Sequence, residues 1–443
     1  MRRSLTQCTP AAASSPRRRR ATTALFGLLI SAVACGAPNV TPQPGVSATT
    51  ASPSLPGPST TSPASSSAPS PAATVLATTT PGDPVQGSLG PGPAPASSID
   101  VETRPLVGPV QATVRASAVW TGTEAIYWGG FYMPPDYEPG SMLSDAGAAY
   151  DPATDEWRAV APAPLSPRQR HFAGWTGAEM LLWGGTDERG FAADGAAYDP
   201  RSDSWRLLPP APSAWLADLR AIEEQGGADG AAAIWTGKHW IIGFKGMGDD
   251  ETDPIRVAAY EPDLDGWREL PTVRGLRGGG IGLVWTGTEL VLVSSEDAWR
   301  IELGSDSSWQ RLSGAPGGLP VSSPVWLGDR MLAVVSKWGP IATPWSFLAT
   351  WDPASDSWQP LVQPPHSAHG QLLLGGHLAI VLGSGLAYDL SADAWVRLPL
   401  DVVDRNDAVL AWTGSELVIW GGWHCDMCPS GVFQDGLVLT PTP

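Results

Sequence analysis

The sequence has few charged residues and is poorest in basic ones. Asp, Glu, Lys and Arg make up only 16% of its 443 residues, and 27 basic residues stand against 44 acidic ones, for a formal net charge of −17. This balance argues against nucleic acid or an anionic membrane surface as a partner. It favours a soluble particle whose copies repel one another, so we expect a monomer.

The N-terminal region lacks an apolar run long enough to span a membrane. Residues 24–30 are apolar, but this short run follows two groups of arginines, as in a signal peptide. The small residues before Cys35 resemble a bacterial lipobox, in which the cysteine becomes the lipidated first residue of the mature chain. We therefore expect residues 1–35 to be a lipoprotein signal peptide, and the exported protein to be lipid-anchored at the outer face of the cell membrane. Ordinary secretory cleavage is the alternative.

Residues 36–98 are almost free of charge and consist mainly of Ala, Pro, Ser, Thr, Gly and Val, with Asp83 as the one charged residue. Such a segment cannot bury enough apolar surface to offset the entropy of ordering it. We expect a disordered tether with a reach of roughly 40–50 Å. A tether of that reach would hold the rest of the chain away from a membrane.

Cysteine is scarce as well, and the region after the tether has only Cys425 and Cys428. In an exported protein, two cysteines at this spacing most simply form a local disulfide. A redox pair usually needs a helix N-terminus to lower the thiol pKa, and a zinc site needs a second pair of ligands. The sequence offers neither, so we favour the disulfide over these two alternatives and expect no metal.

Glycine and proline are abundant, with 50 and 45 residues, and they punctuate a repeated pattern. Between residues 174 and 210, one hairpin pattern ends in Gly184-Gly185 and a second has Tyr198 and Trp205 separated by six residues. Short strands bounded by Gly, Pro, Asp and Ser clusters predict a four-stranded antiparallel meander.

The two hairpin patterns recur with a period of about 50 residues, which indicates a repeat architecture. The first occurs seven times, beginning at Val119, Gly174, Ile234, Val284, Val325, Leu372 and Ala411. The second occurs six times, beginning at Ala148, Ala196, Ala258, Trp299, Ala349 and Leu386. The seventh copy of the second pattern is cut short at the end of the chain.

These repeats resemble those of kelch-repeat β-propellers, whose blades carry a double glycine after the second strand and then an aromatic residue, six residues and Trp. The double glycine is complete in three repeats, at Gly129-Gly130, Gly184-Gly185 and Gly421-Gly422. The resemblance implies an all-β, seven-bladed propeller of four-stranded antiparallel blades over residues 99–443, of the bacterial lipoprotein type. It implies no particular function, because one fold hosts many activities.

The two ends of the propeller region predict how the ring closes. Residues 437–441 align with a third strand and end the last repeat, whereas residues 100–106 resemble a fourth strand that has no first three. We expect residues 100–106 to complete the seventh blade, so that no broken sheet edge remains.

The repeated turns should lie on one face of the ring and the variable connections on the other, where loops on a rigid scaffold can form a binding site. Arginines and histidines precede the predicted innermost strands and could surround the channel mouth, where arginine would bind a carboxylate. The candidate ligand-binding residues are Arg115, Arg170, His171, Arg277, His369 and Arg405. The alternative is that they pair with loop carboxylates such as Asp187, Glu188 and Asp218.

Two further groups in the variable loops allow a functional and a structural interpretation. Residues 249–253 are dense in carboxylates that could bind calcium, but a solvated loop is favoured, because the spacing of an EF-hand is absent. Six aromatic residues could stack on sugar rings or fill gaps between blades. They are Tyr132, Tyr137, Trp215, Trp338, Trp345 and Trp423.

The sequence lacks the serine-hydrolase elbow, the HExxH zinc motif and the phosphate-binding loop. We therefore expect a binding or scaffold module, without a cofactor, that recognises a protein or glycan at the cell surface. The family includes copper-radical oxidases and sialic acid mutarotases, so the alternative is a carbohydrate-active enzyme of the epimerase, mutarotase or lyase type. Such an enzyme would use His171, His369 and Arg170 at the channel mouth.

Overall fold

A computed structural model describes most of the chain after residue 96. The described residues are 97–98, 101–132, 142–213, 215–216, 228–246, 254–274, 280–294, 297–304, 307–315, 319–338, 344–399, 405, 407–423 and 433–441. The predicted signal peptide with Cys35, almost all of the predicted tether, residues 249–253, Arg277, Cys425 and Cys428 lie outside them. No helix in the described part of the chain is long and apolar enough to cross a membrane.

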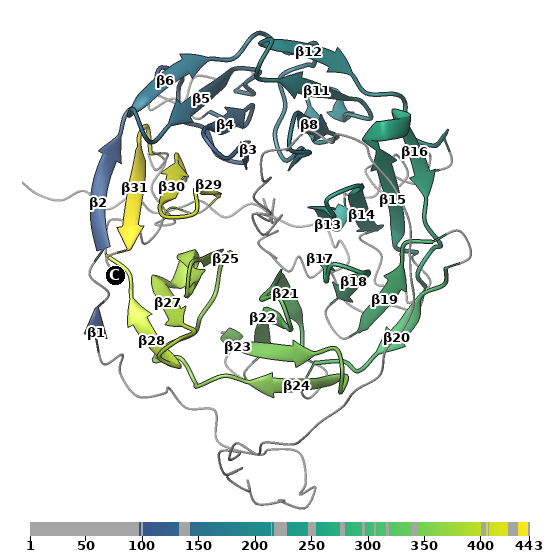
Figure 1. Ribbon diagram of the computed structural model, residues 1–443, viewed down its shortest axis with the longest axis vertical. Coiled ribbons are helices and arrows are strands. Elements are labelled where there is room, and N and C mark those ends of the chain that lie inside the picture. The colour runs from purple at the N-terminus through teal and green to yellow at the C-terminus, as the bar shows by residue number, and fades with distance from the viewer. Residues whose placement is uncertain are drawn as a thin grey trace, which may run out of the picture.

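The described residues form a seven-bladed β-propeller of four-stranded antiparallel blades, which confirms the predicted fold (Figure 1). The first strand of each blade is innermost, and the fourth is outermost. In blades 1 to 7, the first strands are β3 (Ser117–Trp120), β7 (Phe172–Trp175), β13 (Ala228–Trp235), β17 (Ile281–Trp285), β21 (Val321–Trp326), β25 (Leu372–Gly375) and β29 (Val409–Trp412).

The other three strands of each blade follow in the same order. The second strands are β4 (Ala125–Trp128), β8 (Met180–Trp183), β14 (Trp240–Gly246), β18 (Glu289–Ser294), β22 (Met331–Trp338), β26 (Leu378–Val381) and β30 (Leu417–Trp420). The third strands are β5 (Gly147–Asp151), β11 (Gly195–Asp199), β15 (Arg256–Glu261), β19 (Ala298–Glu302), β23 (Pro344–Asp352), β27 (Leu386–Asp389) and β31 (Gly436–Pro441). The fourth strands are β6 (Glu156–Ala159), β12 (Ser204–Leu207), β16 (Gly266–Glu269), β20 (Gln310–Leu312), β24 (Ser357–Pro360), β28 (Ala394–Arg397) and β2 (Val101–Leu106).

A few short elements lie outside this scheme. The strand β1 (Ser97–Ser98) pairs in parallel with β28 at the outer edge of blade 6. A small hairpin, β9 (Thr186–Asp187) and β10 (Gly190–Phe191), occupies the connection between the second and third strands of blade 2. Two short 3-10 helices are η1 (Pro262–Leu264) and η3 (Leu382–Ser384).

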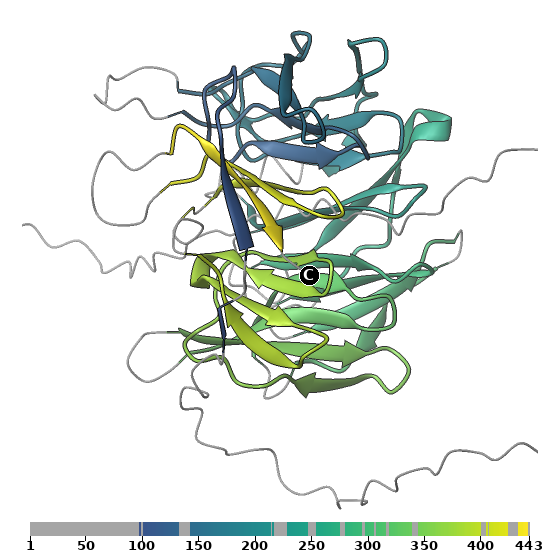
Figure 2. The same cartoon turned by 60° about the vertical axis from the view of Figure 1, so that its left-hand side comes forward.

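The ring closes through the strand that precedes the first blade, as predicted. β2 pairs antiparallel with β31 along its whole length, from Val101 opposite Pro441 to Leu106 opposite Gly436. Figure 2 shows β2, in dark blue, beside the yellow β31. Blade 7 therefore contains strands from both ends of the propeller region, and its sheet is four-stranded like those of its neighbours.

The two faces of the ring differ in their connections. The turns between first and second strands, and those between third and fourth strands in blades 1 to 6, are short, and we call their side the tight-turn face. The opposite side, which holds the connections of variable length, is the variable face. Because Val101 pairs with the last residue of β31, the chain enters the ring at the tight-turn face.

One cluster of buried apolar side chains fills each contact between neighbouring blades, which we call a seam and name by its two blades. In seam 7/1, for example, Leu106 and Val418 of blade 7 pack with Ala118 and Tyr127 of blade 1. Fully burying one large apolar side chain is worth about 1.5–3 kcal/mol. The core is therefore divided among seven similar seams rather than gathered in one place.

The repeated spacing of tyrosine, aspartate and tryptophan joins neighbouring blades. In blade 2, the Tyr198 hydroxyl donates a hydrogen bond of 2.6 Å to Asp203, and the Trp205 indole donates one of 2.7 Å to the Ala161 carbonyl of blade 1. In blades 1, 2, 5 and 6 the first aspartate of the turn accepts bonds from backbone N–H groups, as Asp199 does from Arg201. These turns are thus Asx-type structures that need no catalytic explanation.

Candidate binding site at the centre of the variable face

Three loops that precede the innermost strands of blades 7, 1 and 2 are joined at the centre of the variable face. The Arg115 N–H donates a hydrogen bond of 3.2 Å to the Asp407 carbonyl, and the Arg170 N–H donates one of 2.9 Å to the Arg115 carbonyl. The three residues take the same place in their blades, two positions before β29, β3 and β7. A backbone ladder therefore crosses two seams.

All three residues have a left-handed backbone, with φ of 57° at Arg115, 58° at Arg170 and 53° at Asp407. Aspartate tolerates this conformation, and five other aspartates adopt it in the turns of the tight-turn face. For arginine it is uncommon, and it costs on the order of 1 kcal/mol or more unless the surroundings enforce it. The ladder supplies that enforcement.

The side chains above the ladder form a polar group that solvent can reach. The Arg115 Nε donates to Asp407 Oδ2 at 3.0 Å, and its Nη1 lies 3.5 Å from Gln169 Oε1. The side chains of Arg115 and Asp407 are 33% and 25% exposed. Guanidinium, carboxylate and amide groups held together in this way can bind hydroxyl or carboxylate groups of a ligand.

Two other arginines in these loops are buried and brace the blades. Arg168 donates from Nη1 to the Gly184 carbonyl at 3.2 Å and to Asp194 Oδ1 at 2.7 Å. Arg405 repeats this arrangement with the Gly421 carbonyl at 3.1 Å and Asp435 Oδ1 at 2.8 Å. In blade 1 the hydroxyl of Thr113 takes the same role and donates to the Gly129 carbonyl at 2.9 Å. Each of the three side chains thus bonds to the first residue of a double glycine.

His171 lies in seam 1/2 beneath the ladder and is only 2% exposed. Its Nε2 is 2.6 Å from the Ser117 hydroxyl, and its ring meets Trp128 edge to face at 5.0 Å. Burial and, to a smaller extent, the nearby charge of Arg168 lower the pKa of His171 from 6.5 to about 3. The imidazole is therefore neutral at ordinary pH and sealed from solvent.

The glycines around His171 explain why the double glycines occur where they do. A Cβ at Gly129 would lie 2.8 Å from the His171 ring, and one at Gly185 would lie 2.8 Å from the His171 Cβ. Both glycines also have positive φ, of 73° and 87°. Any larger residue would be strained in backbone and would clash with the histidine.

Of the remaining candidate residues, His369 lies apart from the ladder, and Arg277 lies outside the described residues. His369 is exposed in the loop before β25 of blade 6, and its Nδ1 is 3.1 Å from the Ser367 carbonyl. Arg170, in the ladder itself, is partly buried. The structure thus brings Arg115, Arg170 and Asp407 together, with Arg168, Arg405 and His171 acting inside the blades.

The six loop aromatics also differ in their exposure to solvent. Trp215 is 1% exposed and packs between Trp183 and Phe244, with ring centroids 4.8 and 5.0 Å away, so it fills the interior at blades 2 and 3. Trp345 is partly exposed, as are Tyr132 and Trp423. Tyr137 and the side chain of Trp338 lie outside the described residues.

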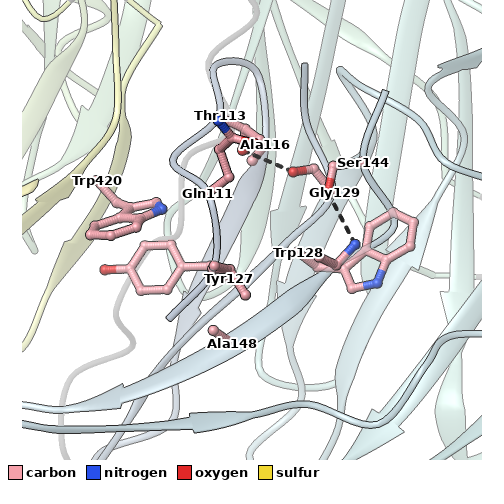
Figure 3. Close-up of a pocket in the computed structure, with 11 residues that line it drawn as sticks. Gln111, Thr113, Ala116, Tyr127, Trp128, Gly129, Ser144, Ala148 and Trp420 are labelled. Atoms are coloured by element: carbon pink, nitrogen blue, oxygen red, sulfur yellow. Dashed lines mark hydrogen bonds between the residues drawn. The ribbon is translucent and has the colours of Figure 1, made fainter. Parts of the chain in front are cut away.

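A narrow cleft lies in seam 7/1 (Figure 3). Its volume is about 250 Å³, including the open solvent at its mouth, and it is lined by Gln111, Thr113, Tyr127 and Trp420 among others. The Tyr127 hydroxyl is buried and has no hydrogen-bond partner among the described residues, and burial raises its pKa. Its aromatic neighbours are Trp420 and Trp157, with ring centroids 6.4 and 5.7 Å away.

Among the described residues, no group of three or more His, Cys, Asp or Glu side chains is arranged to hold a metal ion. No protein-family model matches the chain, and no curated protein does either. The fold and the site geometry are therefore the grounds on which a function can be argued.

The sequence contained little that would separate the exposed residues of this site from the buried ones. Neither Gln169 nor the ion pair between Arg115 and Asp407 has a local sequence signal, and the two paired residues are 292 positions apart. The bond between Ser117 and His171 also has no local signal, since it crosses a seam. The equivalent placement of Arg168 and Arg405, each four residues before an innermost strand, was visible as a pattern.

Proposed function

We propose that the protein is a lipid-anchored binding module at the outer face of the cell membrane, and that it recognises a protein or glycan through its variable face. In this proposal Cys35 carries the lipid, residues 36–98 are the tether, and the propeller belongs to the kelch type. Three complete double glycines and the tyrosine to tryptophan spacing support the kelch assignment.

The observation that carries the proposal is the left-handed backbone at Arg115 and Arg170. Strain of this kind is retained mainly where function needs a side chain in one place. The aspartates with positive φ on the tight-turn face need no such explanation, because each accepts hydrogen bonds within a repeated turn. At Arg115 the strain instead presents a guanidinium at the surface, and we infer a contact with hydroxyl or carboxylate groups.

Binding is favoured over catalysis for a specific reason. An epimerase or lyase built on this loop group would need a general base at the surface, and His171 was the candidate nearest to Arg170. Its burial in seam 1/2 and its low pKa both oppose that role.

The proposal can be tested by thermal shift on the mature chain with Cys35→Ser, which prevents lipidation. The probes are sialic acid, glucuronic acid and glucose, which separate carboxylate from hydroxyl recognition. A ligand at 100 times its Kd should stabilise the protein by about 2.7 kcal/mol. Arg115→Lys keeps the charge but removes the planar fork, so it should abolish the shift.

The matched control is Arg330→Lys, because Arg330 pairs with Asp329 in a turn on the tight-turn face. This variant should keep the full ligand-induced shift. A shift that survives in Arg115→Lys would place binding elsewhere and contradict the assigned site. No shift with any probe would leave protein recognition, to be tested by crosslinking on intact cells with the same two variants.

A further inference from the structure

The innermost strands end in a ring of large apolar side chains on the tight-turn face. In six blades this residue is tryptophan, and in blade 6 the corresponding place is taken by leucine. All seven side chains are partly exposed. We call them the indole ring: Trp120, Trp175, Trp235, Trp285, Trp326, Leu374 and Trp412.

Each member of the indole ring packs against a different seam. Trp120 contacts the cluster of seam 7/1, Trp175 that of seam 1/2, and Leu374 that of seam 5/6. A Cβ on Gly375 of blade 6 would lie 2.9 Å from the Trp412 ring, so this indole covers the turn of the preceding blade. One side of each ring member is thus covered by its seam, and the strands that carry the ring members are the innermost strands of the propeller (Figure 1).

Contiguous apolar side chains on a surface mark interaction sites. The rest of the tight-turn face is unsuited to an anionic partner, because its turns carry two aspartates in most blades, such as Asp151 with Asp155 and Asp389 with Asp393. A neutral segment rich in proline is better suited, since proline segments in the polyproline II conformation dock on aromatic surfaces.

The chain itself supplies such a segment. Residues 36–96 contain the polyproline signature P-x-x-P twice, at Pro53 to Pro56 and at Pro81 to Pro84, and carry a single charge. They connect to the ring at Val101, which lies at the tight-turn end of β2. As a random coil, a segment of about 60 residues would have a reach of roughly 40–50 Å from the face on which it starts.

We propose that the proline-rich residues 36–96 dock on the indole ring of their own chain. This interaction would hold the tight-turn face toward the membrane anchor and leave the variable face directed outward. The inference concerns the face opposite the Arg115 site, so it can fail without affecting the ligand proposed there, and the converse also holds.

The test uses the mature chain with Cys35→Ser, labelled with 5-fluorotryptophan and observed by fluorine NMR. Single Trp→Leu substitutions assign the ring signals, and the fold accepts leucine at this place, as Leu374 demonstrates. The comparison variant replaces Pro53, Pro56, Pro81 and Pro84 with alanine. The ring signals of Trp120, Trp235 and Trp412 should shift between the two proteins, and the shift should be independent of protein concentration.

The reference signal comes from Trp205, which is bonded to the Ala161 carbonyl between the outer parts of blades 1 and 2 and should not move. Identical ring signals in the two proteins would overturn the proposal. So would a shift that grows with concentration, because the occupant would then be a second copy. A shift of Trp205 as large as those of the ring would mean a general change in the fold and would also count against docking.

Discussion

In the part of the chain that the structure describes, arginines join blades 7, 1, 2 and 3 to one another, and no equivalent arginine joins blades 4, 5 and 6. In seam 1/2, Arg158 makes two bonds of 2.7 Å to Glu124 of its own blade and one of 2.9 Å to the Tyr198 hydroxyl of the next. Arg206 repeats this in seam 2/3 with Glu179 and Tyr260. In seam 7/1 the arginine is Arg104 of the closing strand, which bonds Asp155.

Among the described residues, the other seams lack the arginine of this arrangement, the tyrosine that it bonds, or both. Ile301 stands where the tyrosine would be in blade 4, and Gln310, Gln359 and Val396 stand where the arginine would be in blades 4, 5 and 6. The three complete double glycines fall in blades 7, 1 and 2 as well. One part of the ring is therefore more tightly specified by polar contacts, and the Arg115 site lies in that part.

The largest effect on stability is expected from removal of the strand that closes the ring. Deleting residues 99–107 takes away β2, exposes the edge of β31 and removes Leu106 from seam 7/1. We expect a collapse of thermal stability, because the ring would open at its best-bonded part. Calorimetry of the deleted and intact chains measures this, and an unchanged melting temperature would refute closure by β2.

Acid should weaken seam 1/2 more than the seams of blades 4 to 6. Because the folded-state pKa of His171, about 3, lies below the ordinary 6.5, unfolding takes up a proton in the window between them. The stability from neutral His171 is therefore complete above pH 6.5 and falls by about 1.4 kcal/mol for each pH unit below it. Denaturant unfolding at pH 7.0 and pH 4.5 gives the difference.

The control variant for this experiment is His171→Gln, which cannot be protonated and should reduce the loss of stability between the two pH values. Burial also lowers the pKa of His239, so the His171→Gln variant keeps part of the pH dependence and the informative quantity is the difference between the two chains. His369→Gln, at an exposed position, should follow the wild type. Equal pH dependence in all three chains would contradict a buried neutral His171.

The fold was predictable from the sequence because each blade is specified by local patterns. The strand pattern, the tyrosine to tryptophan spacing and the unpaired fourth strand at residues 100–106 all lie within short windows. The site was harder, because Arg170 and His171 are neighbours in sequence with opposite environments. The left-handed turn at Arg170 keeps its backbone in the ladder and sends the histidine into the seam. That turn depends on bonds to another blade, which no local pattern contains.

The smallest expected effect gives the sharpest comparison between the two parts of the ring, because the chain contains a matched pair of seams. Tyr198 and Tyr388 each donate to the aspartate five residues later. Arg158 of blade 1 bonds the Tyr198 hydroxyl, and Gln359 takes the place of Arg158 in blade 5. Arg158→Gln should therefore give seam 1/2 the chemistry of seam 5/6. We expect a loss of about 1 kcal/mol, since the guanidinium is partly exposed and solvent screens its charge.

The reverse change, Gln359→Arg, should raise the free energy of unfolding by a few tenths of a kcal/mol through seam 5/6. The Tyr388 hydroxyl already holds Asp393, which can accept a new bond from the arginine. Urea unfolding of the two single variants and the double variant measures both effects. The substitutions lie in separate seams, so their effects should add. If Arg158→Gln costs nothing while Gln359→Arg stabilises, the arginines act through net charge on an acidic protein. The distinction between the two parts of the ring would then rest on the double glycines and their buried donors alone.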